Sequence, residues 1–145
     1  IKTVKGEDTV LYKNGSLSSA VKYTYKVRAY ANSNGTNIYG AYSVTKSAET
    51  KPAQVKGLKL TTKSSSITLR WTKQSNVTGY QIYRYNASTG KYEKIKTIKG
   101  ASTVTYANKG RKKGTIYKYK VRAYKTSGTK NTYGSFSAVA KIKAK

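Results

Sequence analysis

An internal repeat constrains this chain more than any other feature of its sequence. Residues 1–50 match residues 95–144 at a constant offset of 94 without a gap, and about 21 of the 50 aligned pairs are identical. The run Tyr23–Tyr30, for example, returns as Tyr117–Tyr124. Such self-similarity predicts one structural unit of about 94 residues that is used more than once. We therefore expect residues 1–50 to be the C-terminal half of one repeat and residues 51–145 to be a complete one, within a longer tandem array.

The composition removes most kinds of catalytic and metal chemistry. The 145 residues include no cysteine and no histidine, and the only acids are Glu7, Asp8, Glu49 and Glu93. A Cys/His metal site and a His-based nucleophilic triad cannot be assembled, and a paired-carboxylate site would need acids that the complete repeat lacks. We expect no enzymatic activity and no cofactor. The chain also has no long apolar run, so we expect no insertion into a membrane.

The charge is extreme for a chain of this size. Thirty basic residues against four acidic ones give a net charge of +26, which generates a long-range positive potential and favours polyanionic partners. Only five of the thirty are arginine. Because lysine is a hydrated point charge rather than a planar fork, this ratio favours diffuse attraction, spread over both copies, over sequence readout. Nonspecific attraction to nucleic acid is expected of any such polycation.

Alternation with a period of two residues predicts an all-β fold, since no segment keeps a helical period. Turn-rich pieces separate seven expected strands in the complete repeat, a spacing typical of a β-sandwich. The expected strands are residues 55–62, 66–71, 80–85, 92–98, 103–106, 115–124 and 135–142. The only proline, Pro52, stands at a very short join between the copies, which favours a stalk over a flexible tether.

Three pieces of the sequence carry a family resemblance. Trp71 closes the run from Ile67, a tyrosine-containing run spans Gly79–Arg84, and Tyr117–Tyr124 precedes a serine-rich last strand. Together they resemble a bacterial fibronectin type III domain, complete over residues 52–145 and half present over 1–50. The resemblance implies an immunoglobulin-like β-sandwich that serves as a spacer, adhesive or accessory module. It also implies an extracellular place, on the surface of a Gram-positive bacterium or secreted from it, and no catalytic residues.

Strand parity predicts one candidate ligand face. Alternation turns Tyr117, Tyr119, Val121 and Ala123 toward the core, together with Tyr80, Ile82 and Trp71. The opposite parity turns the other side chains of both strands outward, and the resemblance implies that the two strands are neighbours. One outer face would then bear Tyr83, Tyr85, Lys118, Lys120, Arg122 and Tyr124. Tyrosine rings flanked by cations can stack on sugars or bases and hold an anionic polymer. The alternative is a solvated sheet face with ordinary aromatic and cationic cross-strand pairs.

A basic loop is the second candidate site. Its charged members are Lys109, Arg111, Lys112 and Lys113, a cluster of the kind that binds heparin or directs nuclear import. The corresponding loop of the first copy, residues 15–20, is neutral, so the fold itself does not demand this charge. A contact specific to the complete copy and a simply solvated loop are the two interpretations.

Three functions remain open at this stage. The first is a structural stalk, spacer or filament module that is held by its charge to anionic wall polymers. The second is a dedicated glycan- or polyanion-binding module, and the third is the accessory region of a wall-active or polysaccharide-degrading enzyme. Residues 1–50 would present half a core and an unpaired edge. Two interpretations are open: the chain simply begins mid-domain, or strands of a preceding segment or of another subunit complete these residues.

Overall fold

The protein folds entirely into β-strands, loops and turns. The computed structural model describes residues 1–145 and contains no helix, so no helix crosses a membrane. The first 50 residues hold β1 (Lys22–Tyr25), β2 (Tyr30–Ser33), β3 (Thr36–Tyr39) and β4 (Lys46–Glu49). The remaining residues hold β5 (Lys59–Lys63), β6 (Ser66–Arg70), β7 (Gly79–Asn86), β8 (Lys91–Lys99), β9 (Thr105–Asn108), β10 (Ile116–Ser127), β11 (Lys130–Tyr133) and β12 (Ala140–Lys143).

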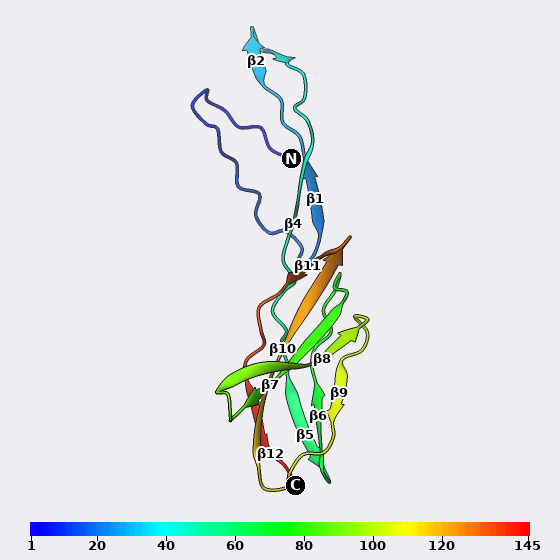
Figure 1. The fold of residues 1–145 in the computed structure, drawn as a ribbon. Coiled ribbons are helices and arrows are strands. Elements are labelled where there is room, and N and C mark those ends of the chain that lie inside the picture. The colour runs from blue at the N-terminus through cyan, green and yellow to red at the C-terminus, as the bar shows by residue number, and fades with distance from the viewer.

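Residues 51–145 form a two-layer antiparallel sandwich. One layer is the three-stranded sheet β5-β6-β9, and the other is a five-stranded sheet in which β8, β7 and β10 are neighbours. The hairpin strand β11 pairs with the C-terminal part of β10, whereas β12 pairs with its N-terminal part. The first 50 residues extend beyond one end of this sandwich, and the C-terminus lies at the other end (Figure 1). The predicted all-β immunoglobulin-like sandwich is therefore confirmed.

The core lies between the two sheets and follows the predicted alternation. Tyr119, Val121 and Ala123 of β10 are fully buried, while the Trp71 and Tyr80 rings pack edge to face with their centroids 5.3 Å apart. Such an aromatic pair adds about 1 kcal/mol to the free energy of burial. Tyr117 is half-buried and anchors the loop before β10, because its hydroxyl accepts a hydrogen bond of 3.0 Å from the Lys112 N–H. The inward residues expected from parity are thus confirmed.

The same strand register occurs twice, 94 residues apart. In β1 and β4, Lys22 lies opposite Glu49 and Tyr25 opposite Lys46, while in β10 and β12 Ile116 lies opposite Lys143 and Tyr119 opposite Ala140. Loop hydrogen bonds repeat as well: the Ser18 N–H donates to the Tyr23 hydroxyl at 2.9 Å, just as the Lys112 N–H does to that of Tyr117. These shared bonds give residues 18–50 and 112–144 the same local arrangement.

The two copies differ in what covers their apolar faces. Val27 is 71% exposed, whereas the equivalent Val121 is 0% exposed. The reason is that neither the facing sheet β5-β6-β9 nor the neighbouring strand β7 of the complete copy has a counterpart beside residues 22–33. Residues 1–21 form no strand, and their Val10 and Leu11 side chains are largely exposed. Half a core therefore faces solvent in this chain.

Two expected strands are shorter than the sequence pattern predicts. The strand expected from Val55 begins only at Lys59, because Gly57 adopts φ +67° and turns the chain out of an extended path. The strand expected from Ser135 begins only at Ala140. Before it, the Ser137 hydroxyl takes the place of a backbone acceptor and receives the Val121 N–H at 3.0 Å, so residues 134–139 follow β10 without a regular ladder.

The junction between the copies is packed. Ala20 is buried as part of the core cluster, and its N–H donates to the Lys51 carbonyl at 3.2 Å. Both carboxylate oxygens of Glu49 lie 2.9 Å from the Ser127 hydroxyl, which bonds the end of β4 to the β10–β11 hairpin. Pro52 is also buried. These contacts restrict the angle between the two parts of the chain.

Candidate functional site

The outer face of the five-stranded sheet carries alternating cations and aromatic rings. The register sets Lys120 opposite Tyr83 and Arg122 opposite Gln81, and residues that lie opposite each other share a face of the sheet. We call this surface the aromatic-cationic face. It consists of Tyr83, Tyr85, Tyr92, Lys118, Lys120, Arg122, Tyr133 and Phe136.

Arg122 is fixed at the centre of this face. Its Nε and Nη2 donate to the Gln81 Oε1 at 3.0 and 2.9 Å, and Nη2 also donates to the Tyr83 hydroxyl at 2.9 Å. The guanidinium carbon lies 4.1 Å from the Tyr133 ring centroid. These contacts use the planar fork of the guanidinium and one of its faces, so Arg122 serves mainly to hold three strands together.

The ammonium groups of two lysines lie over the neighbouring aromatic rings. The Lys120 Nζ lies 4.0 Å from the Phe136 centroid and 4.4 Å from that of Tyr92, within the range of a cation–π interaction. The Lys118 Nζ lies 5.0 Å from the Tyr85 centroid. A sugar or a base that stacked on these rings would have to displace the protein's own cations. The face is therefore better suited to an anion, which meets the ammonium groups, than to a flat neutral ligand.

Three rings of this face were absent from the sequence-based set. Tyr92, Tyr133 and Phe136 reach it from β8, from β11 and from the irregular segment before β12. Tyr92 lies in a strand that the sequence predicted, so its alternation could have indicated which face it occupies. Its ring centroid lies 5.3 Å from that of Tyr85, a member of the predicted face. The position of Phe136 depends on the path of residues 134–139, which no periodicity encodes.

Tyr124 requires a correction within the predicted face. Its outward parity is right, but only 5% of the residue is exposed. The register places Tyr124 opposite Gly79, which has no side chain, and the Tyr124 ring lies against that glycine. Tyr124 therefore closes a gap in the sheet and offers almost no surface to a ligand.

The basic loop keeps the backbone structure of its neutral counterpart. Lys109, Lys112 and Lys113 are exposed, whereas Arg111 is half-buried with its guanidinium 5.3 Å from the Tyr117 ring centroid. The Arg111 N–H donates to the Ser65 carbonyl at 2.7 Å. The ammonium groups of its lysines form no hydrogen bond within the protein. The loop therefore remains a candidate for external contacts.

A buried polar cluster lies below this loop. The Asn108 Oδ1 accepts hydrogen bonds from the Tyr119 hydroxyl at 2.9 Å and from the Arg84 Nη1 at 3.2 Å. Burial raises the pKa of Tyr119 to about 12, although the charges of Arg84 and Arg111 act in the opposite direction. The neutral phenol is therefore the form that the fold stabilises.

This raised pKa predicts a loss of stability in alkali. The unfolded phenol ionises near pH 10, so its contribution is complete below that pH and is lost as the pH rises from about 10 to about 12. We expect a loss of about 2 to 3 kcal/mol in the free energy of unfolding over that interval. Urea unfolding of the wild type and of Tyr119→Phe at a series of pH values measures it, since Arg84 still bonds Asn108 in the variant. Parallel pH dependence in the two proteins would contradict the assignment to Tyr119.

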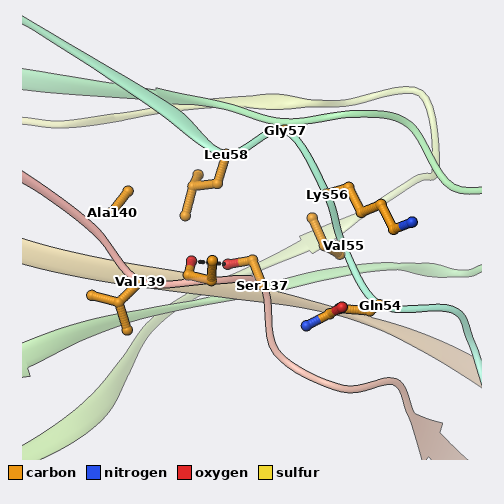
Figure 2. A pocket seen from close by; sticks show the side chains of 9 residues that line it. Gln54, Val55, Lys56, Gly57, Leu58, Ser137, Val139 and Ala140 are labelled. Carbon is orange, nitrogen blue, oxygen red and sulfur yellow. Dashed lines mark hydrogen bonds between the residues drawn. The ribbon is translucent and has the colours of Figure 1, made fainter.

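A shallow groove separates residues 54–58 from residues 137–140. It has a volume of about 300 Å³ and a largely apolar lining that includes Val55, Leu58 and Val139. Figure 2 shows the Lys56 side chain directed away from Val139 and Ala140. The Ser137 hydroxyl, the one hydroxyl of the lining, donates to the Ala138 carbonyl at 2.8 Å. The groove thus offers no free nucleophile and no charged group that points inward.

The positive charge is unevenly shared between the copies. Residues 1–50 carry seven basic and three acidic side chains, whereas the equivalent residues 95–144 carry thirteen basic and no acidic ones. Both copies therefore carry a net positive charge, and the complete copy carries more of it. The loop 109–113 and the outer face of β10 and β12 account for most of the difference, which makes the charge a property of particular surfaces.

The two facing sheets, the strand order and the tyrosine bonded to its preceding loop define an immunoglobulin-like sandwich. Residues 50–138 match the fibronectin type III domain family, and the chain belongs to that family. Fibronectin type III domains are generally non-catalytic structural or interaction modules, and they are typically extracellular. Among curated proteins, none shows significant similarity to the chain.

Solved structures of the family resemble the chain at low sequence identity. A segment of two fibronectin type III domains from chicken tenascin is 15% identical with a TM-score of 0.60, and the match covers 83% of this chain and 65% of that one. The FN1-FN3 domains of chicken CNTN1 are 21% identical with a TM-score of 0.54, over 92% of this chain and 44% of that one. A fibronectin type III domain of the human fibronectin type III domain containing protein 3 is 18% identical with a TM-score of 0.55, over 67% and 89%. These likenesses concern the fold.

Proposed function

We propose that this chain is a non-catalytic structural module of a larger tandem-repeat protein, held by its positive charge to anionic polymers of a bacterial cell wall. The observation that carries the proposal is the lack of internal compensation for the charge. Glu93 accepts hydrogen bonds from Asn86 and Thr89, and Glu49 accepts one from Ser127, so both acids bond neutral groups. Lysines that lie over aromatic rings keep their formal charge.

The junction supports a role as a stalk or spacer. Ala20, Pro52 and the bond between Glu49 and Ser127 restrict the angle between successive units, so an array would project as a semi-rigid rod. The repeat of 94 residues and the register that residues 22–49 share with residues 116–143 support the tandem organisation. We place the protein outside the cell, secreted or on the surface of a Gram-positive bacterium, where wall polymers supply fixed negative charge.

We further propose that strands from a neighbouring repeat or subunit cover the exposed half of the core in the first copy. The side chains to be covered are those equivalent to buried residues of the complete copy, above all Val27. Strands arranged as β6 and β7 are in the complete copy would meet this requirement.

Binding across a salt series tests the proposed function. The native chain is titrated with purified wall polymer, with a neutral glycan and with single-stranded DNA from low to high salt. We expect the logarithm of the affinity for the wall polymer to fall linearly with the logarithm of the salt concentration, and the neutral glycan not to bind. Binding of the neutral glycan that resists salt and disappears in Tyr85→Ala would support a carbohydrate-recognition module instead. Absence of salt-dependent binding to the wall polymer would refute the proposal.

A further inference from the structure

Two lysines stand directly opposite each other on the pair of strands β10 and β12. Lys118 and Lys141 are register partners, so their Cβ atoms are about 5 Å apart on the outer face of the sheet. Like charges in this arrangement destabilise a strand pair. Lys143 is two residues further along β12, and Lys120 is two residues further along β10 in the other direction. We call Lys118, Lys120, Lys141 and Lys143 the lysine strip.

The first copy shows that this fold does not require three of the four lysines, since only Lys120 has a lysine, Lys26, at the equivalent position. At the positions of Lys118 and Lys141 it has Thr24 and Ser47, whose hydroxyl oxygens form a hydrogen bond of 2.7 Å. At the position of Lys143 it has Glu49. The residue pair at the positions of Lys118 and Lys141 is therefore uncharged and hydrogen-bonded in the first copy, and like-charged in the complete copy. We therefore expect the complete copy to be less stable with these two lysines than it would be with the threonine and serine of the first copy.

Two lysines of the strip are held in place. Cation–π contacts with Tyr85 position Lys118, and contacts with Phe136 and Tyr92 position Lys120. Because side chains that are already ordered lose less entropy on binding, these contacts prepare the ammonium groups for an anion. The only acid of residues 51–145 is Glu93, which bonds Asn86 and Thr89, so it does not offset the charge of the strip.

We infer that the lysine strip is a binding site for a linear polyol-phosphate polymer that runs along β10 and β12. Lysines on alternate residues of a strand are about 6.7 Å apart, a spacing that lets successive ammonium groups meet successive phosphodiesters of an extended chain. An ammonium group binds phosphate as a point charge. Nucleic acid is the less suitable occupant, because its bases need free rings on which to stack, and cations occupy the adjacent rings. This site rests on the proposed function and gives it a location.

The first copy supplies the test variant. Lys118→Thr combined with Lys141→Ser restores the pair of the first copy, and Lys112→Ser combined with Lys113→Ser gives the basic loop the residues of its own counterpart, Ser18 and Ser19. Each double variant removes two positive charges. Purified poly(glycerol phosphate) is the probe, and affinity and its salt dependence are measured for the wild type and for both variants.

We expect the strip variant to lose at least about tenfold in affinity and roughly two units of salt slope, one for each lysine. The loop variant is expected to lose much less, and the strip variant to unfold at a higher temperature than the wild type. Equal losses in the two variants would overturn the strip while the proposed function stood. Absence of salt-dependent binding by the wild type would refute both the lysine strip as a binding site and the proposed function. Tighter binding of single-stranded DNA than of the polyol phosphate, weakened only by the strip variant, would overturn the choice of ligand.

Discussion

Replacing Gly79 by alanine is expected to destabilise the complete copy by about 3 kcal/mol, which is the cost of forcing an extra carbon into a packed interior. A Cβ at this position would overlap the carbonyl oxygen of Ile98 and would lie 3.1 Å from the Tyr124 Cε1. The tyrosine ring can turn, but the carbonyl belongs to the backbone of β8. We therefore expect the sheet to open at this point.

The surrounding backbone leaves little room for adjustment. The Thr78 N–H donates to the Tyr124 carbonyl at 2.8 Å, and the Gly100 N–H donates to the Thr78 carbonyl at 2.8 Å, so the start of β7 is bonded to both neighbouring strands. A loss of about 3 kcal/mol lowers the melting temperature of a domain of this size by roughly 12 to 24 °C.

Trp71 makes the measurement specific, because it is the only tryptophan and lies in the core of the complete copy. Thermal and urea unfolding are followed by its fluorescence. Gly40→Ala is the matched control: a Cβ there would meet only the Ala29 carbonyl oxygen, at 3.7 Å, so this variant is expected to melt like the wild type. A Gly79→Ala protein with the melting temperature of the wild type would show that β8 can move away without cost.

Alternation predicted the core because a buried strand face needs an apolar side chain at every second residue. Tyr119, Val121 and Ala123 satisfy that condition in β10, and the structure buries all three. Pattern reasoning failed where something other than the residue's own parity determines its environment. Tyr124 has outward parity, yet it is buried because Gly79 on the next strand has no side chain.

Local irregularities account for the other differences. The hairpin strand β11 extends beyond the sandwich, so it needs no apolar face and its sequence, Lys130–Tyr133, shows no alternation. The sequence pattern predicted no strand between residues 124 and 135. In the structure β10 continues to Ser127, residues 128 and 129 form the hairpin turn, and β11 follows. On the candidate face, the tyrosines and lysines were predictable from parity, whereas their pairing was not. The conformations of long side chains that extend across neighbouring strands determine which cation lies over which ring. Phe136, one of these rings, belongs to a segment that forms no regular strand pairing.

Val121→Ala is expected to cost the complete copy about 2 to 3 kcal/mol, because the deleted methyl groups lose their burial and leave a cavity. Val121 is 0% exposed between the two sheets. Val27→Ala removes the same atoms at the equivalent position, where the side chain is 71% exposed, and is expected to change the free energy of unfolding by less than about 0.5 kcal/mol. Urea unfolding followed by Trp71 fluorescence and by far-ultraviolet circular dichroism reports on the complete copy and on the whole chain, respectively.

This pair of variants also tests what covers the first copy. The two valines have the same local hydrogen bond, since the Val27 N–H donates to Ser43 Oγ at 3.1 Å and the Val121 N–H to Ser137 Oγ at 3.0 Å. Any difference between the variants must therefore come from the strands that lie over each side chain. If another chain covers Val27, its truncation costs as much as that of Val121, and the stability rises with protein concentration. A small cost that does not depend on concentration means that no second copy of this chain covers the face in solution.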